Sequence, residues 1–321
     1  GKPHYVLVIL VSTAVTYYCG MRMGEKETRS GRGPFLAIAI AVNLGFLFFF
    51  KYLNLFGIDL ESLLAHANIL EGSEGLGLIV PLGISFYTLQ TLSYLVDVYR
   101  GDIRPERHFG YLALYVSFFP TLLAGPIERG SHLLPQLHGH YRFDYDRVTY
   151  AIKLFAWGMF LKIVIADRLG LYVNQVYGDV HSYRGLPLLF ATLFFAVQLY
   201  CDFSGYSDIA RGVARIMGFD LMINFRQPFY SSSLGELWRR WNISLTSWLR
   251  DYLYVPLGGS REGEMKTVRN IMIVWLVSGL WHGAAWTFII WGLFYGFWLV
   301  VERLVQKNLQ PEKRLGAGVS L

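Results

Sequence analysis

Long apolar runs constrain this chain more than any other feature of its sequence. They cover residues 34–50, 79–96, 111–125, 150–166, 186–201 and 271–301, and a further run, 5–18, lies close to the first residue. A membrane-spanning helix needs about 20 mostly apolar residues, and we interpret 271–301 as a pair of helices. Some runs are short or contain a lysine, so we also expect re-entrant, tilted or broken helices.

The composition indicates the same class of protein. The chain is 54% hydrophobic and only 16% charged, whereas an average soluble domain has about 25% charged residues. We therefore predict an all-α polytopic membrane protein in contact with membrane lipids. The formal net charge of +6 suits basic loops at the membrane surface better than nucleic-acid binding, because no basic cluster stands apart from the apolar runs.

The first residue and two polar segments suggest how the chain is organised. The sequence begins with Gly1 and enters an apolar run almost at once. We predict one membrane domain over 1–321, a fragment without its native N- and C-terminal segments. Segment 22–32 has four basic residues, which favours a cytoplasmic loop, although an ordinary solvated loop fits nearly as well. Segment 59–77 is predicted to lie at the membrane interface.

Cysteine and histidine spacing does not indicate a metal centre. Cys19 and Cys201 are the two cysteines, too few for a disulfide framework or a cysteine cluster. His132, His138 and His140 lie in a polar stretch without the spacing or supporting ligands of a zinc site. We expect no bound metal and interpret these histidines as loop residues.

His282 places one imidazole inside the apolar run 271–301. An ionisable side chain at membrane depth costs a few kcal/mol unless it faces a polar cavity or a partner. Such a residue is a candidate for function by default. The alternative is a histidine that hydrogen-bonds a backbone carbonyl within a helix bundle.

Residues 234–259 are predicted to form one amphipathic helix. Ser233 and Glu236 have the spacing of a capping box at its start. Apolar side chains recur at steps of three and four along one side of it, namely Trp238, Trp241, Leu245, Trp248 and Tyr252. Asn242 falls within this stripe, and a buried amide without a partner costs about 1–3 kcal/mol. A polar group must meet it, and His282 is the best candidate.

Two further segments place charged groups close to apolar runs. Asp202 or Ser204 could cap a helix predicted over 209–217, and Asp208 is three residues before Arg211, the spacing of an ion pair on a helix. Two carboxylates so close to membrane depth suggest a polar cavity. After the helix break at Gly125-Pro126, Glu128 and Arg129 are predicted to pair with each other at the interface.

In six segments the chain resembles the membrane-bound O-acyltransferase superfamily, in its bacterial polysaccharide O-acetyltransferase branch, which includes alginate O-acetylation enzymes. These segments are 85–90 (SFYTLQ), 119–127 (FPTLLAGPI), 202–208 (DFSGYSD), 229–230 (FY), 238–245 (WRRWNISL) and 281–283 (WHG). The last two are the specific ones. Their order covers nearly the whole chain, and the family has sequence beyond both of its ends.

The resemblance implies a fold, a reaction and a location. The fold would be a ring of transmembrane and re-entrant helices around a thin central tunnel, in a multi-pass protein of the bacterial inner membrane. A cytosolic thioester, acetyl-CoA or another acyl carrier, would donate an acetyl group. The acceptor would be an extracytoplasmic cell-envelope polysaccharide or carrier protein, and no permanently bound cofactor is implied.

The resemblance also assigns residues. His282 occupies the family's near-invariant histidine position and would be the catalytic base. Asn242 stands where many close relatives have a second histidine, and would orient the imidazole or donate a hydrogen bond to the thioester oxygen. Arg239 and Arg240 would contact phosphates of CoA, although arginines facing solvent or lipid headgroups fit equally well. The remaining residues would form or support the tunnel wall, namely Trp238, Trp241, Trp281, Asp202, Ser204, Tyr206 and Asp208.

A transporter or flippase without acyl-transfer chemistry is the main alternative, because such proteins also have broken helices and polar residues inside the membrane. The sequence has no internal repeat of the kind that many transporters show. A non-catalytic membrane scaffold would have no need for Asn242 and His282. The His-x4-Asp motif of glycerolipid acyltransferases is excluded at this site, because Thr287 is five residues after His282.

Overall fold

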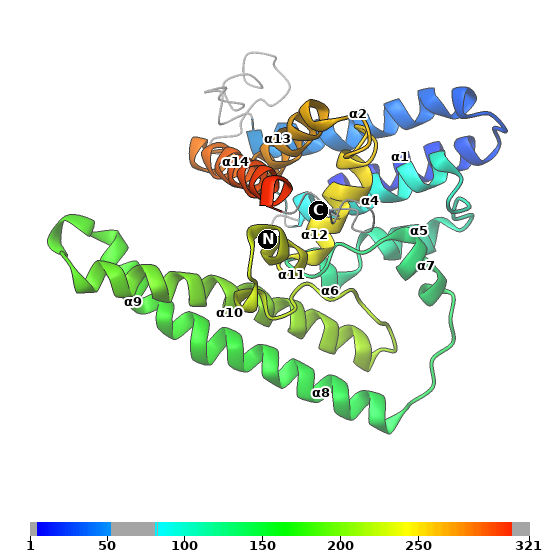
Figure 1. Ribbon diagram of the computed structural model, residues 1–321. Coiled ribbons are helices and arrows are strands. Elements are labelled where there is room, and N and C mark those ends of the chain that lie inside the picture. The colour runs from blue at the N-terminus through cyan, green and yellow to red at the C-terminus, as the bar shows by residue number, and fades with distance from the viewer. Residues whose placement is uncertain (1–4, 53–80, 82, 310–321) are drawn as a thin grey trace, which may run out of the picture.

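The computed structural model describes residues 5–52, 81 and 83–309, and every regular element in these ranges is a helix (Figure 1). The predicted all-α polytopic membrane fold is thereby confirmed. The predicted interfacial segment 59–77 lies outside the described residues. The single domain over 1–321 and the ring of helices around a central tunnel stay predictions.

In the described ranges, six helices precede the longest pair of the fold. They are α1 (Tyr5–Gly24), α2 (Arg29–Tyr52), α4 (Ile84–Arg100), α5 (Phe109–Val116), α6 (Phe119–Leu122) and α7 (Gly130–Leu137). The longest pair begins with α8 (Tyr145–Met159). A π-helical turn, η2 (Phe160–Ala166), continues α8 directly into α9 (Asp167–Gly178). A short 3₁₀ turn, η3 (Val180–Ser182), then leads to α10 (Leu186–Ile216). The π-turn lies where the predicted run 150–166 ends.

The last third of the chain consists of shorter helices and a final pair. These elements are η4 (Pro228–Tyr230), α11 (Leu234–Arg240), α12 (Ile243–Leu249), η5 (Arg250–Tyr254), α13 (Glu264–His282) and α14 (Trp286–Leu309). The predicted pair in run 271–301 is thus α13 and α14, separated at residues 283–285. His282 is the last residue of α13.

Within the described residues, five helical segments are long and apolar enough to cross a membrane: Val6–Gly24, Arg29–Tyr52, Tyr145–Gly178, Leu186–Ile216 and Trp286–Leu309. The run 111–125 does not form a span. It divides into α5 and α6 at Ser117, with Pro120 in the first turn of α6. Proline lacks the N–H that a continuing helix needs, which accounts for the break.

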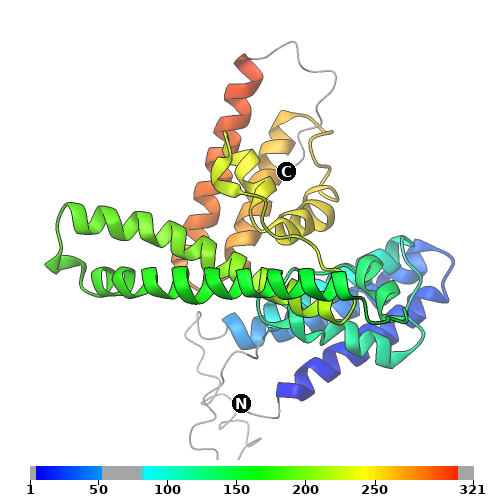
Figure 2. The same ribbon diagram turned by 90° about the horizontal axis from the view of Figure 1, so that it is seen from below.

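Two views show how these helices are arranged. The hairpin of α8, α9 and α10 extends along one side, and α1 and α2 lie on another (Figures 1 and 2). The α13–α14 pair is a third group of helices, and the end of α13 contacts the end of α2. Helix α4 is buried along most of its length, and Tyr94 and Leu95 are fully buried. Its side chains join both major apolar clusters, one with α1, α2 and α5 and the other with α12, α13 and α14.

Two glycines allow α13 and α14 to approach closely. A Cβ atom at Gly279 would collide with the carbonyl oxygen of Phe288, and one at Gly292 would collide with that of Trp275. Small residues at such crossings let helix backbones come into contact inside a membrane. This close crossing lies one turn before His282 and brings the imidazole against α14.

Candidate active site

His282 has one well-defined hydrogen bond, to its own helix. Its Nδ1 lies 2.7 Å from the carbonyl oxygen of Ser278, one turn earlier on α13. A carbonyl can only accept, so Nδ1 must carry the proton, and a neutral imidazole then has a bare Nε2. This bond is the one expected of a histidine with a purely structural role, but it also prepares the ring to act as a base through Nε2.

Aromatic rings surround this imidazole. The ring centroids of Trp281 and Trp291 lie 5.0 Å and 4.7 Å from that of His282, and Phe288 stacks at 6.5 Å. Trp238 of α11 contacts Trp291 at 5.7 Å and is itself buried. The predicted wall residues Trp238 and Trp281 therefore do belong to the surroundings of His282.

The predicted continuous helix over 234–259 is wrong. The capping-box start is present, since Ser233 Oγ accepts from the N–H of Glu236, but the helix stops at Arg240. Asn242 has φ 44° and ψ 52°, a left-handed conformation, and α12 begins after it. Asparagine tolerates this conformation better than most residues. The apolar side chains on both sides of this break still belong to one cluster, which includes Trp238, Leu245 and Trp248.

Asn224 holds the start of α12 in place from a distant part of the chain. Its carbonyl accepts from the N–H of Ile243, and its side-chain oxygen accepts from the N–H of Ser244 at 3.2 Å. These two bonds satisfy donors that the first turn of any helix leaves without partners. The backbone around Asn242 is consequently fixed rather than adaptable.

Asn242 is buried, with 5% of its surface exposed, but it does not meet His282 as expected. Among the described residues, no hydrogen bond joins the two side chains, and the carbonyl of Asn242 accepts from the N–H of Thr246. Trp238 of the preceding α11 contacts Trp291, and Trp291 in turn contacts the imidazole of His282. Its catalytic role stays a prediction.

A pocket of about 510 Å3 lies on the other side of α11. Three predicted site residues line it, namely Ser204, Asp208 and Arg240. The other lining residues, which the sequence analysis did not assign, are Leu154, Trp157, Tyr200, Arg211, Phe225, Arg226 and Gln227. Trp241 lies behind this wall, with its ring 5.1 Å from that of Phe225, while Arg239 is exposed and is not part of the lining.

The pocket is rich in guanidinium groups. Arg211 donates to Asp208 at 2.8 Å, which confirms the predicted ion pair, and Arg240 donates to Glu236 at 2.6 Å. Arg226 lines the pocket and, in the described part of the chain, its side chain has no acidic partner. The pocket therefore favours an anionic ligand, and phosphate groups fit such donors well.

Asp202 and Tyr206 do not line this pocket. Asp202 accepts from the Lys162 ammonium at 2.6 Å, and that ammonium also pairs with Asp167 at 2.7 Å and lies over the ring of Tyr206. Neither Asp202 nor Ser204 caps a helix, because α10 continues unbroken to Ile216. Lys162 explains why Asp202 and Asp167 lie near membrane depth, because a lysine there needs acidic partners.

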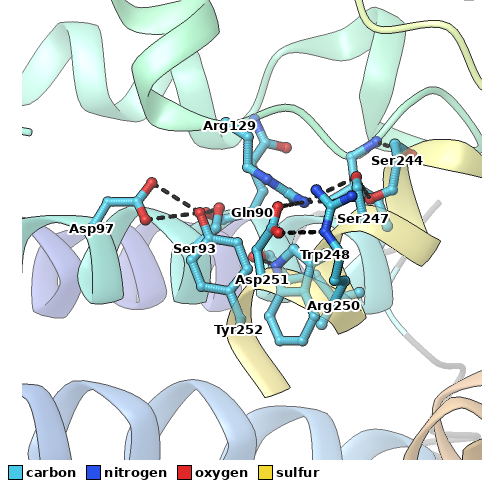
Figure 3. Close-up of polar contacts among 12 residues, drawn as sticks. Gln90, Ser93, Asp97, Arg129, Ser244, Ser247, Trp248, Arg250, Asp251 and Tyr252 are labelled. Carbon is cyan, nitrogen blue, oxygen red and sulfur yellow. Dashed lines mark hydrogen bonds and ion pairs between the residues drawn. The ribbon is translucent and has the colours of Figure 1, made fainter. Parts of the chain in front are cut away.

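A polar cluster beside α12 fixes it against α4 (Figure 3). The Tyr252 hydroxyl donates to both carboxylate oxygens of Asp97, at 2.8 and 2.9 Å. Arg129 lies over the ring of Tyr252 and donates to Ser247 Oγ at 3.3 Å. The predicted pair between Glu128 and Arg129 is wrong, because Arg129 bonds to Ser247 whereas Glu128 bonds to His132.

Glu128 instead pairs with His132. Its side chain is fully buried and its Oε2 lies 2.6 Å from His132 Nδ1, one turn into α7. This hydrogen bond raises the pKa of His132 above its ordinary value, although partial burial of the ring opposes the effect. His132, which lies on α7, is thus a hydrogen-bond partner of a buried carboxylate rather than an incidental loop residue.

Sequence reasoning missed three residues that contact the end of α13. Lys51 and Tyr52 of α2 donate to the carbonyl oxygens of Trp281 and Leu280. Ser85 of α4 accepts from Lys51 Nζ through its hydroxyl and from the Trp281 indole N–H through its carbonyl, both at 3.1 Å. The sequence feature that could have indicated this contact is Lys51 itself, a lysine directly after the apolar run 34–50.

The fold and this site define a helical, multi-pass membrane protein with a histidine in an aromatic setting. Comparison with known proteins gives the family. The model of the membrane-bound O-acyltransferase family matches residues 106–314, well over half of the chain. The chain belongs to the membrane-bound O-acyltransferase family.

Several curated relatives are similar to this chain. A probable alginate O-acetylase of Pseudomonas putida is 39% identical over 302 residues, which is 94% of this chain and 62% of the relative. A peptidoglycan O-acetyltransferase of Helicobacter pylori is 34% identical over 93% of this chain and 61% of the relative. A teichoic acid D-alanyltransferase of Bacillus subtilis is 27% identical over 72% and 60%. The chain thus spans about three fifths of the length of these relatives.

Proposed function

We propose that this chain is the core of a membrane O-acetyltransferase. It would move an acetyl group from a cytosolic thioester, acetyl-CoA or another acyl carrier, to a hydroxyl on the far side of the membrane. The observation that carries the proposal is the hydrogen bond from His282 Nδ1 to Ser278, which leaves Nε2 free to accept a proton. Family membership and the surrounding aromatic residues support it.

His282 is the general base of the proposed reaction. Its Nε2 takes the proton of the acceptor hydroxyl while the hydroxyl oxygen attacks the thioester carbonyl. The new C–O bond forms, the C–S bond breaks, and the imidazolium returns the proton to the leaving thiolate. General-base help of this kind contributes about 10²–10⁴-fold to a rate.

Asn242 would serve the same reaction as a hydrogen-bond donor. Negative charge develops on the thioester oxygen during attack, and a fixed amide that donates to such an oxygen contributes about 3 kcal/mol in other acyl transfers. Its fixed backbone suits this role, because a preorganised donor does not have to move as the charge forms.

The pocket beside α11 would hold the donor. Guanidinium groups of Arg226 and Arg240 would contact phosphates of CoA or of a phosphopantetheine carrier. Arg239 is exposed and would act only where the donor extends beyond the pocket. Trp241, Asp202 and Tyr206 would support the pocket from behind rather than contact the donor.

The acceptor would be an extracytoplasmic polysaccharide or a carrier protein, with this protein in the bacterial inner membrane. The names of the relatives refer to alginate, peptidoglycan and teichoic acid, and they favour a polymeric acceptor over a small metabolite. The acetyl group is favoured by the relatives that are 34–39% identical, since two of these are named for O-acetylation.

Double labelling tests the reaction class. The full-length protein is placed in sealed liposomes, with acetyl-CoA that carries ³H on the acetyl group and ¹⁴C on the adenine, and with an oligosaccharide acceptor inside. Acetyl transfer moves ³H to the interior acceptor and leaves ¹⁴C outside as free CoA. Movement of both labels together into the vesicle, with the thioester intact, would instead establish a transporter.

A further inference from the structure

Lys51 is a charged residue near the end of an apolar helix. It lies in the last described turn of α2, a helix that is long and apolar enough to span the membrane. A lysine at the centre of such a helix costs about 3 kcal/mol without compensation, and near the end of the helix it can instead extend to the membrane interface. The side chain is half-buried against α4 and α13 rather than directed away from the protein. Its position therefore needs an explanation in terms of what it contacts.

Its contacts converge on the last turn of α13. The ammonium donates to the carbonyl oxygen of Trp281 and, at 3.1 Å, to the hydroxyl of Ser85. It also lies 5.6 Å from the centre of the Trp281 ring, within range of a cation–π interaction. The neighbouring Tyr52 hydroxyl donates to the carbonyl oxygen of Leu280.

The end of any helix leaves four carbonyl groups without partners in the helix itself. In α13 the Gly283 N–H reaches the Gly279 carbonyl only at 3.4 Å, and the chain after it is extended. The backbone that follows thus gives the final turn little support. The side chains of α2 supply the bonds to Leu280 and Trp281, and a cation at a helix C-terminus also complements the helix dipole.

The same turn holds His282. The carbonyl that accepts from His282 Nδ1 belongs to Ser278, so the imidazole and its partner both depend on the geometry of this turn. The Trp281 ring contacts both Lys51 and His282. Its centre is 5.6 Å from the Lys51 ammonium and 5.0 Å from the centroid of the imidazole.

We propose that Lys51 is a positioning residue for His282. Its ammonium holds the final turn of α13 so that the imidazole keeps Nδ1 on Ser278 and presents Nε2 to the acceptor hydroxyl. This inference rests on the proposed function for its effect on rate, but its effect on the imidazole does not depend on any activity. A residue that only helped α2 and α13 to assemble would leave the imidazole unchanged in a folded variant.

The test combines kinetics with ¹⁵N spectra of the full-length enzyme in lipid nanodiscs. Histidine is labelled with ¹⁵N, and the ring signals of His282 are assigned by their loss in His282→Asn. Lys51→Met is compared with Lys51→Arg, which keeps a cation, and with Lys153→Met. Lys153 is a matched control, because it is an exposed lysine on the spanning segment of α8.

In Lys51→Met we expect kcat to fall about 10- to 100-fold with little change in KM, because a displacement of about 1 Å can cost about 100-fold. The separate signals of protonated Nδ1 and bare Nε2 should merge or broaden. Lys51→Arg should restore both readouts in part, and Lys153→Met should match the wild type. If Lys51→Met does not accumulate, Lys51→Gln takes its place, with the same change expected in smaller measure.

Two results would overturn the proposal: wild-type kcat in Lys51→Met, or a low kcat with unchanged His282 signals. Changed His282 signals in a protein whose wild type transfers no acetyl group would support the positioning role and refute the proposed function instead. The spectra therefore separate the failure of this inference from the failure of the proposed function.

Discussion

The imidazole of His282 lies 4.7 Å from the indole of Trp291, centroid to centroid, across the crossing of α13 and α14. This contact exists because the two helices cross at Gly279 and Gly292, where a Cβ atom on either residue would strike the backbone of the other helix. The position of the candidate base therefore depends on Gly279 and Gly292, which have no side chain that could take part in the reaction.

Gly292→Ala should separate α13 from α14. The added methyl group meets the carbonyl of Trp275, which cannot move away as a flexible side chain could. Overpacking of this kind costs about 1–3 kcal/mol, and we expect both a lower thermal midpoint and a loss of acetyl transfer. Gly45→Ala in α2 is the control, because its Cβ would meet nothing within 4 Å. Unchanged stability in Gly292→Ala would contradict the crossing.

Substitutions at Asn242 distinguish two roles of this residue, the left-handed backbone conformation and the hydrogen bond proposed for the side-chain amide. Glycine adopts the left-handed conformation freely, whereas alanine there costs about 1–2 kcal/mol. We expect Asn242→Gly to keep the thermal midpoint but to lower kcat about 100-fold, as the loss of an oxyanion donor does in other enzymes. Asn242→Ala should lose both stability and activity. Full activity in Asn242→Gly would limit Asn242 to shaping the chain.

Arg226 should affect donor binding more than chemistry. Removal of a hydrogen bond to a charged group costs about 1.5–3 kcal/mol, so Arg226→Gln should raise KM for acetyl-CoA about 10-fold or more while kcat stays nearly constant. Salt should reduce the difference from the wild type, since it screens exposed charges. Arg184→Gln, in the exposed segment before α10, is the control. An unchanged KM would move the donor phosphates away from this pocket.

The Glu128–His132 pair should make stability depend on pH. The pKa of His132 is raised in the folded protein by its hydrogen bond to Glu128. The stabilisation is thus fully present below the ordinary histidine value of about 6.5 and is lost as pH rises through the raised value. The thermal midpoint should therefore fall as the pH rises above about 6.5.

His132→Gln should flatten that part of the profile, whereas His140→Gln, at an exposed position, should not. Thermal unfolding monitored at half-unit pH steps measures both effects. A pH profile of His132→Gln that is as steep as that of the wild type would show that another group titrates.

Much of the fold follows from hydrophobicity alone. The apolar runs predict α2, α8, α10, α13 and α14 because the bilayer requires length and apolar composition. The break at Asn242 was not predictable from periodicity, because Trp241 and Leu245 continue the helical spacing through a residue with positive φ. The bonds that stabilise this break come from Asn224, which is distant along the chain.

Individual residues of the candidate site could be predicted from the sequence, but the contacts between them could not. His282 stands out as an ionisable residue in an apolar run, and the family resemblance adds Asn242 and the tryptophans. Lys51 and Ser85 could not be connected to His282 without the packing of α2 and α4 against α13. Similarly, the ion pair between Asp202 and Lys162 could not be predicted, because the two residues are 40 positions apart in the sequence.

Transfer of labelled acetyl groups by His282→Gln tests the central claim most directly. Glutamine keeps a polar side chain near the size of imidazole but cannot take up a proton at neutral pH, and His138→Gln, in an exposed segment, serves as the control. Full-length proteins in liposomes are supplied with radiolabelled acetyl-CoA and an acceptor glycan. The account predicts a loss of at least about 100-fold in His282→Gln and normal transfer in the control. Transfer at the wild-type rate by His282→Gln would contradict it.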